Sequence, residues 1–233
     1  MLGADRLESG VGRLRSLLVL AGLIPSMAMA QVDPHQHHGD HGHGVGPAGN
    51  TYDLRWLDAM VQHHTGALRM SELVFDSGQP GVGALAKAMW SDQAREIKAM
   101  GQWRRSWYPQ APVGPLVLRL GGDPNAMADL VPAAQGQIAM MRMIGPLPSP
   151  ATRTTWFLEG MLEHHGGALV MAHEALRNSS NPTVQALARQ IIVAQRREIL
   201  ELRRMLHHDG LHKAAYDRFD ALFSLNDQKQ SLR

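Results

Sequence analysis

Two stretches of the sequence decide the fold: Met60–Met70, which reads MVQHHTGALRM, and Met161–Met171, which reads MLEHHGGALVM. They lie 101 residues apart, and seven of their eleven positions are identical. On an α-helix, which advances about 100° per residue, the methionines and the histidine pair of each stretch fall on one stripe roughly 120° wide. Such a stripe is typical of a helix face that packs on a core. Both stretches are therefore predicted to be helices with Met and His directed inward.

Each of these helices is followed by a second one, so that the repeated unit is a helical hairpin. Clusters of Gly, Pro, Asn and Ser separate the two helices of each unit. The expected helices span residues 51–75, 82–107, 152–177 and 183–208. On the return helices, Gln93 and Glu96 of the first unit correspond to Gln195 and Glu198 of the second.

Two antiparallel hairpins of this length most simply pack as a four-helix bundle, which predicts an all-α fold. The chain then divides into a first hairpin repeat at 51–107, a Pro- and Gly-rich linker at 108–151, a second repeat at 152–208 and a C-terminal tail at 209–233. The linker would be the long crossover, with a short helix inside residues 125–143. A short amphipathic helix is also expected in the tail.

The N-terminus has the pattern of a signal peptide spanning residues 1–30. Arg13 and Arg15 precede a short apolar run, and the segment ends in the small-x-small sequence Ala28-Met29-Ala30. The apolar run is too short for a membrane span, which needs roughly 20 apolar residues. We therefore expect an exported protein, periplasmic or secreted, without a membrane span.

Composition restricts the chemistry. The chain contains 14 Met and 13 His but no Cys, and its formal net charge is +2. An exported chain without cysteine has neither disulfides nor thiolate metal sites, so a soft metal ligand must be a methionine thioether. The small net charge gives no general attraction to nucleic acid or to anionic lipid.

The Met/His stripes predict a metal site. Thioether combined with imidazole suits Cu(I) and tolerates Cu(II), whereas Mg and Ca need several oxygen ligands that these faces do not supply. Glu96 and Glu198 would lie opposite the histidines and hydrogen-bond the second ring nitrogen of a ligand, which fixes its tautomer. Gln93 and Gln195 share the faces of these glutamates.

A separate metal signal lies in residues 31–50, which are rich in Gly and polar residues and are predicted to form a disordered tail. The tail carries five histidines: His35, His37, His38, His41 and His43. Such a segment chelates Cu(II), Zn or Ni without needing a fold.

Other interpretations stay open. The buried histidines could be hydrogen-bonded core residues of a helical interaction or scaffold module, with Met as core filler. The chain could also be a Zn or Ni buffer that acts through its tail. An enzyme is not expected, because these helices lack the Glu-x-x-His motif of di-iron proteins and a recognisable nucleophile–base pair. The cluster His207, His208 and His212 is interpreted as a solvated helix end.

The motifs HHxxAxxM and Gln-x-x-Glu-Ile, each present twice, resemble the bacterial family called domain of unknown function 305, which includes periplasmic copper-binding proteins of the CopM type. The resemblance covers residues 51–107 and 152–206, as two tandem copies. It implies a ferritin-like helical bundle and, for the characterised type, copper binding and resistance. The ligands that it implies are Met60, His63, His64, Met70 and Met100 in the first copy, and Met161, His164, His165 and Met171 in the second.

The second copy departs from the family pattern at two positions. Thr154 stands where the first copy has Asp53, and Leu202 stands where the first has Met100. The second site is therefore expected to be weaker or structural. Taken together, the sequence predicts a non-catalytic protein that sequesters copper or hands it on to another copper-handling protein, with Cu(I) in the bundle and Cu(II) in the tail. The oligomeric state stays open.

Overall fold

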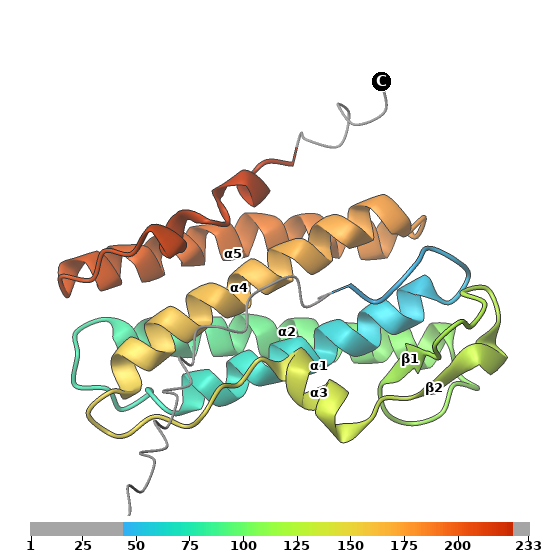
Figure 1. Ribbon diagram of the computed structural model, residues 1–233, viewed down its shortest axis with the longest axis horizontal. Coiled ribbons are helices and arrows are strands. Elements are labelled where there is room, and N and C mark those ends of the chain that lie inside the picture. The colour runs from blue at the N-terminus through green and yellow to red at the C-terminus, as the bar shows by residue number, and fades with distance from the viewer. Residues whose placement is uncertain (1–43, 226–233) are drawn as a thin grey trace, which may run out of the picture. The chain divides into compact units, whose positions relative to one another are not determined.

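The computed structural model describes residues 44–225, and four long α-helices make up more than half of them (Figure 1). They are α1 (Tyr52–Glu72), α2 (Val82–Trp107), α4 (Arg153–Asn178) and α5 (Pro182–His208). The predicted all-α class is confirmed, although α1 ends a few residues earlier than expected. No helix in the described range is long and apolar enough to cross a membrane.

Local chemistry explains how each return helix begins. Pro182 occupies the first position of α5, where its missing N–H has no helical partner to lose. The side-chain oxygen of Asn181 accepts a hydrogen bond of 2.9 Å from the Thr183 N–H and so caps the same helix. Before α2, Gly81 adopts a φ of 85°, which glycine reaches without steric cost. These turns reverse the chain into two antiparallel hairpins.

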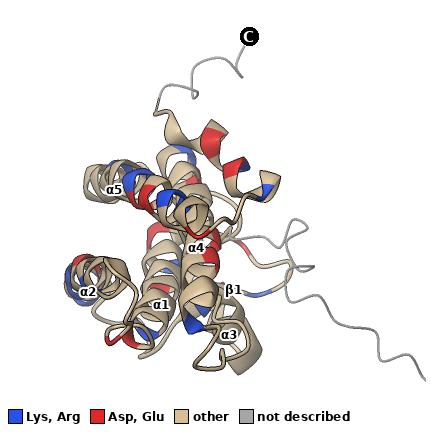
Figure 2. Ribbon diagram, turned by 90° about the vertical axis from the view of Figure 1, so that its left-hand side faces the viewer, with Lys and Arg blue, Asp and Glu red and all other residues tan. Residues whose placement is uncertain are grey.

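The two hairpins meet through their first helices. Close packing joins α1 to α2, α4 to α5, and α1 to α4. Seen along the helices, α1 and α4 lie in the middle, α2 and α5 lie on one side, and α3 (Gln135–Arg142) lies beside α1 on the other side (Figure 2). The indole N–H of Trp56 on α1 donates a hydrogen bond of 3.0 Å to the Met171 carbonyl on α4. This bond ties the hairpins together inside a core that excludes solvent.

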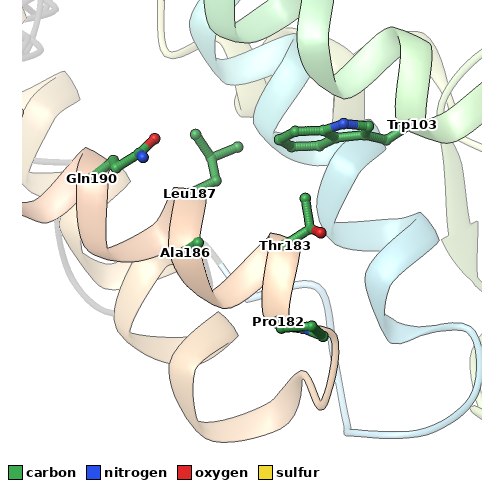
Figure 3. A pocket seen from close by; sticks show the side chains of 6 residues that line it. All are labelled: Trp103, Pro182, Thr183, Ala186, Leu187 and Gln190. Atoms are coloured by element: carbon green, nitrogen blue, oxygen red, sulfur yellow. The ribbon is translucent and has the colours of Figure 1, made fainter.

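A closed ferritin-like bundle would also pack α2 against α5, and this contact is not confirmed. Among the helices of residues 44–225, α2 and α5 are not a closely packed pair. A groove of about 380 Å³ lies between Trp103 on α2 and the first turns of α5, at Pro182, Ala186 and Leu187 (Figure 3). The four helices therefore form two hairpins joined along one seam.

The linker contains more structure than the single short helix that the sequence predicted. Strands β1 (Leu116–Leu118) and β2 (Leu130–Pro132) form a small antiparallel sheet with Leu116 opposite Pro132. Helix α3 follows and covers α1. Alternating apolar residues are too few in these three-residue strands for their pattern to show in the sequence.

After α5 the chain folds back along the second hairpin. Where the sequence predicted a short amphipathic helix, the tail forms two short 3₁₀ helices, Ala214–Asp217 and Asp220–Phe223. Tyr216 is 4 % exposed, and Phe219 packs against the core. The tail therefore covers α4 and α5 much as α3 covers α1.

Candidate metal centre

The four histidines of the repeated stretches are buried where α1 and α4 meet: His63, His64, His164 and His165 are at most 1 % exposed. Adjacent residues on a helix point about 100° apart. One ring of each pair can therefore face the other hairpin while its neighbour faces the return helix of its own hairpin. The structure shows this division, with an inner pair, His63 and His164, and an outer pair, His64 and His165.

The inner pair lies on the seam between the hairpins. The rings of His63 and His164 have centroids 3.7 Å apart and planes inclined by 40°. Nε2 of His164 lies 2.8 Å from the His63 carbonyl oxygen. Because a carbonyl only accepts hydrogen bonds, Nε2 of His164 carries the proton and donates it. The inner pair thus stabilises the contact between α1 and α4.

Each outer histidine meets a glutamate from the return helix. Nε2 of His64 lies 2.6 Å from Glu96 Oε2 with hydrogen-bond geometry. Nε2 of His165 lies 2.7 Å from Glu198 Oε2, but the two groups are not aligned for a hydrogen bond. Both rings are fully buried, while the glutamate side chains are about one-fifth exposed, at 22 % and 17 %. Both glutamates therefore lie beside the outer histidines, and Glu96 forms a hydrogen bond with His64.

The second ring nitrogen of each outer histidine has no partner. Within the described part of the chain, Nδ1 of His64 and Nδ1 of His165 are buried without a hydrogen bond, as are both amide atoms of Gln93 and Oε1 of Gln195. A buried polar atom left unsatisfied costs about 1–3 kcal/mol and is rare in folded proteins. An imidazole held by a carboxylate through one nitrogen, with its other nitrogen available, is a typical metal ligand. These donors fit copper.

The predicted methionine ligands lie in the same core. Met60, Met70, Met100, Met161 and Met171 are all at most 3 % exposed and belong to the hydrophobic cluster around the histidines. In residues 44–225, no group of three or more His, Asp or Glu side chains is arranged to hold an ion. The methionine thioethers are the soft donors that this core offers beside the histidines.

The opposite edge of α1 and α4 has a role that the sequence did not predict. Asp58 accepts hydrogen bonds from Arg104 and, at 2.9 Å, from the Leu116 N–H, and so anchors the linker. Burial raises the pKa of Asp58, although the hydrogen bond from Arg104 offsets part of the rise. At the equivalent position of α4, Glu159 binds the Tyr216 hydroxyl and Lys213, both at 2.5 Å, and anchors the tail.

One turn further along each helix, a second pair of contacts repeats this pattern. Arg142 donates hydrogen bonds of 2.9 and 3.1 Å to Gln62, and Arg218 forms an ion pair with Glu163. Glycines then allow close approach: a Cβ on Gly66 would lie 1.8 Å from the Arg142 carbonyl oxygen, and one on Gly166 would lie 2.1 Å from the Phe219 ring. Glycine inside a long helix was the one sequence signal for these contacts.

Three further regions were considered as sites: the N-terminal tail, the groove beside Trp103 and the histidine cluster at the end of α5. The signal peptide and the tail histidines His35, His37, His38, His41 and His43 lie outside the described residues. The groove beside Trp103 contains none of the predicted ligands. The histidine cluster at the end of α5 is exposed, as expected.

The fold and the site define an all-α protein built from two hairpins that bury paired histidines against return-helix glutamates. The chain belongs to the family described as domain of unknown function DUF305, whose model matches residues 53–206. The match is one stretch that spans both hairpins, so the predicted two tandem copies of the family domain are not supported. No curated protein matches the chain.

Several solved structures are similar to this chain. The chain is similar to CopM in its Cu(I)-bound form, with 25% identity and a TM-score of 0.50 over 67% of this chain and 96% of CopM. The Cu(II)-bound form of CopM matches over the same shares with 24% identity and a TM-score of 0.49. A putative secreted DUF305 protein from Streptomyces coelicolor matches with 23% identity and a TM-score of 0.50, over 70% of this chain and 96% of that protein.

Proposed function

We propose that this protein is an exported, non-catalytic copper-binding protein that sequesters or shuttles the metal through its buried Met/His faces. The observation that carries the proposal is the pair of equivalent outer histidines, each set against a glutamate through Nε2 and each with Nδ1 left without a hydrogen bond. The similarity to CopM, which has been solved in a Cu(I)-bound form, supports copper as the metal. The signal-peptide pattern at residues 1–30 supports export.

The histidines of each pair would have different tasks. His64 and His165 would bind Cu(I) through Nδ1, and Glu96 and Glu198 would hold the rings in the required tautomer. Thioethers from the surrounding methionines would supply the soft ligands that favour Cu(I) over harder ions. Met60, Met70 and Met100 would serve the first hairpin, and Met161 and Met171 the second.

A second candidate function is supported by the inner pair. Because His164 donates to the His63 carbonyl and the two rings contact each other across the seam at an inclination of 40°, these histidines act as core residues. If the outer pair did the same, the protein would be a scaffold module, and the tail histidines alone would collect Cu(II), Zn or Ni. A partner protein that exchanges copper with this chain is expected only if the first function, copper binding by the buried faces, is correct.

An anaerobic Cu(I) competition titration separates these functions. The test protein is the full mature chain with the five tail histidines replaced by asparagine, so that the tail does not contribute. We expect His64→Ala combined with His165→Ala to lower Cu(I) affinity by at least about 100-fold, because each site loses its nitrogen ligand. Glu96→Gln combined with Glu198→Gln should lower it by about 10-fold.

The matched control is His63→Ala combined with His164→Ala, which removes the same number of imidazoles from the same helices. This control should lower the melting temperature but retain most of the Cu(I) affinity of the folded fraction. Unchanged Cu(I) affinity in the outer-pair variant would refute copper binding by the outer histidines and favour the scaffold.

A further inference from the structure

The end of α5 carries an exposed histidine pair that is distinct from the buried faces. The rings of His207 and His212 have centroids 4.5 Å apart and planes inclined by 33°. Both residues are exposed, and both follow residue 206, where the family match ends. The sequence suggested a solvated helix end, but the structure brings the two rings together.

A rigid turn creates this pairing. The Gly210 N–H donates to the His207 carbonyl at 3.0 Å, and the Leu211 N–H donates to the Leu206 carbonyl at 2.9 Å. These two bonds form a Schellman motif, in which the left-handed residue is Gly210 with a φ of 77°. Leu206 is fully buried and Leu211 packs against the core, so the motif is anchored from below. The turn therefore holds His212 over His207.

The ring separation suits chelation of one ion. Two imidazoles bound at right angles, with each nitrogen about 2.0 Å from the ion, have ring centroids about 4.4 Å apart. The buried inner pair, at 3.7 Å, is closer than this spacing. The C-terminal end of a helix also carries partial negative charge, which favours a cation beside His207.

We propose that His207 and His212 form a surface site for a divalent transition-metal ion, with Cu(II) bound more tightly than Zn(II). Two imidazoles with solvent in the other positions are borderline ligands, and affinity for such sites rises to Cu(II) and falls again at Zn(II). His208 is not a third ligand: its Nδ1 lies 3.4 Å from Asp209, and its side chain is 81 % exposed. The site can take Cu(II) from solution without opening the core.

Cu(II) titration of the full mature chain with its five tail histidines replaced by asparagine tests this site. We expect substoichiometric Cu(II) to broaden the NMR amide signals of residues 207–212. His207→Ala or His212→Ala should each lower the affinity of this site by about 100-fold, because chelation by two groups exceeds binding by one by that order. Neither substitution should change Cu(I) binding by the buried faces, so the two proposals can fail independently.

His208→Ala is the matched control, because it removes an exposed imidazole from the same turn. It should change the Cu(II) affinity by less than about twofold, the scatter expected for a group that makes no bond to the ion. Gly210→Ala keeps both imidazoles but strains the turn at φ 77°, so it should weaken Cu(II) binding as well. Equal losses in the His208 and His207 variants, or no broadening at residues 207–212, would overturn the site.

Discussion

The two hairpins are alike in the core that each one encloses and different in the segments that cover them from outside. Between its two helices, each hairpin places one histidine of the outer pair against a glutamate of the return helix, at 2.6 Å in the first hairpin and 2.7 Å in the second. Outside, the first hairpin is covered by the linker and α3, whereas the second is covered by the C-terminal tail. Two segments of unrelated sequence therefore cover equivalent sides of the two hairpins.

Equivalent positions on α1 and α4 contact the different segments that cover the two hairpins. On each first helix, an acid, a polar residue four positions later and a glycine near the next turn form one outward stripe. The stripe consists of Asp58, Gln62 and Gly66 on α1, and of Glu159, Glu163 and Gly166 on α4. The outward side of the first helix is therefore covered in both hairpins, although the covering sequences share no motif.

The largest difference between the hairpins should appear at the acid of this stripe. Asp58 is 4 % exposed and its partner Arg104 is 17 % exposed, so Asp58→Ala leaves a largely buried cation. We expect a loss of roughly 3 kcal/mol in the free energy of unfolding, as for one partner of a buried pair. Glu159→Ala should cost about 1 kcal/mol, because Lys213 is half exposed and returns to solvent. Urea denaturation of both variants measures the difference, and equal losses would contradict it.

The glycines provide a second test of the covers. Gly66→Ala forces a methyl group against the Arg142 backbone oxygen, so α3 must shift, at a cost of about 1–3 kcal/mol. Gly166→Ala meets the Phe219 side chain, which can move more easily, and should cost less. Thermal denaturation ranks the two variants. A larger loss for Gly166→Ala would mean that the tail, and not α3, is the more firmly fixed cover.

The inner faces differ at one predicted ligand, since Met100 on α2 corresponds to Leu202 on α5 and both are fully buried. Met100→Leu should weaken Cu(I) binding by the first hairpin by about 10-fold, and Leu202→Met should strengthen binding by the second by a similar factor. The swap conserves volume, so stability should change by less than about 1.5 kcal/mol. Cu(I) competition titrations check both. Equal affinities before and after either swap would remove Met100 from the ligand set.

The repeated stretches predicted the helical class and placed the buried faces, because period and spacing are properties of single helices. The structure adds that the adjacent histidines divide into an inner and an outer pair, because neighbouring residues on a helix point about 100° apart. The closed bundle was not predictable in this way, since packing of α2 against α5 depends on how two separate hairpins tilt along their seam. The covers were missed because Arg142 and Arg218 reach their partners from 80 and 55 residues away in the sequence.

Charge on the second hairpin gives the smallest expected effect. Glu174 on α4 stands where the first hairpin has Leu73, and burial raises the pKa of Glu174, with Arg177 offsetting part of the rise. The folded state therefore holds the Glu174 proton to higher pH than the unfolded chain does. Stability falls as pH rises from the ordinary glutamate pKa of about 4.3 through the raised value.

Glu174→Gln removes this ionisation and should raise the melting temperature by about 1–2 °C at pH 7, with little change at pH 4. Leu73→Glu would introduce the same charge into the first hairpin and should lower the melting temperature at pH 7 but less at pH 4. Circular dichroism melts at the two pH values measure both variants. If Glu174→Gln were destabilising at pH 7, the attraction between Glu174 and Arg177 would outweigh the burial of the carboxylate.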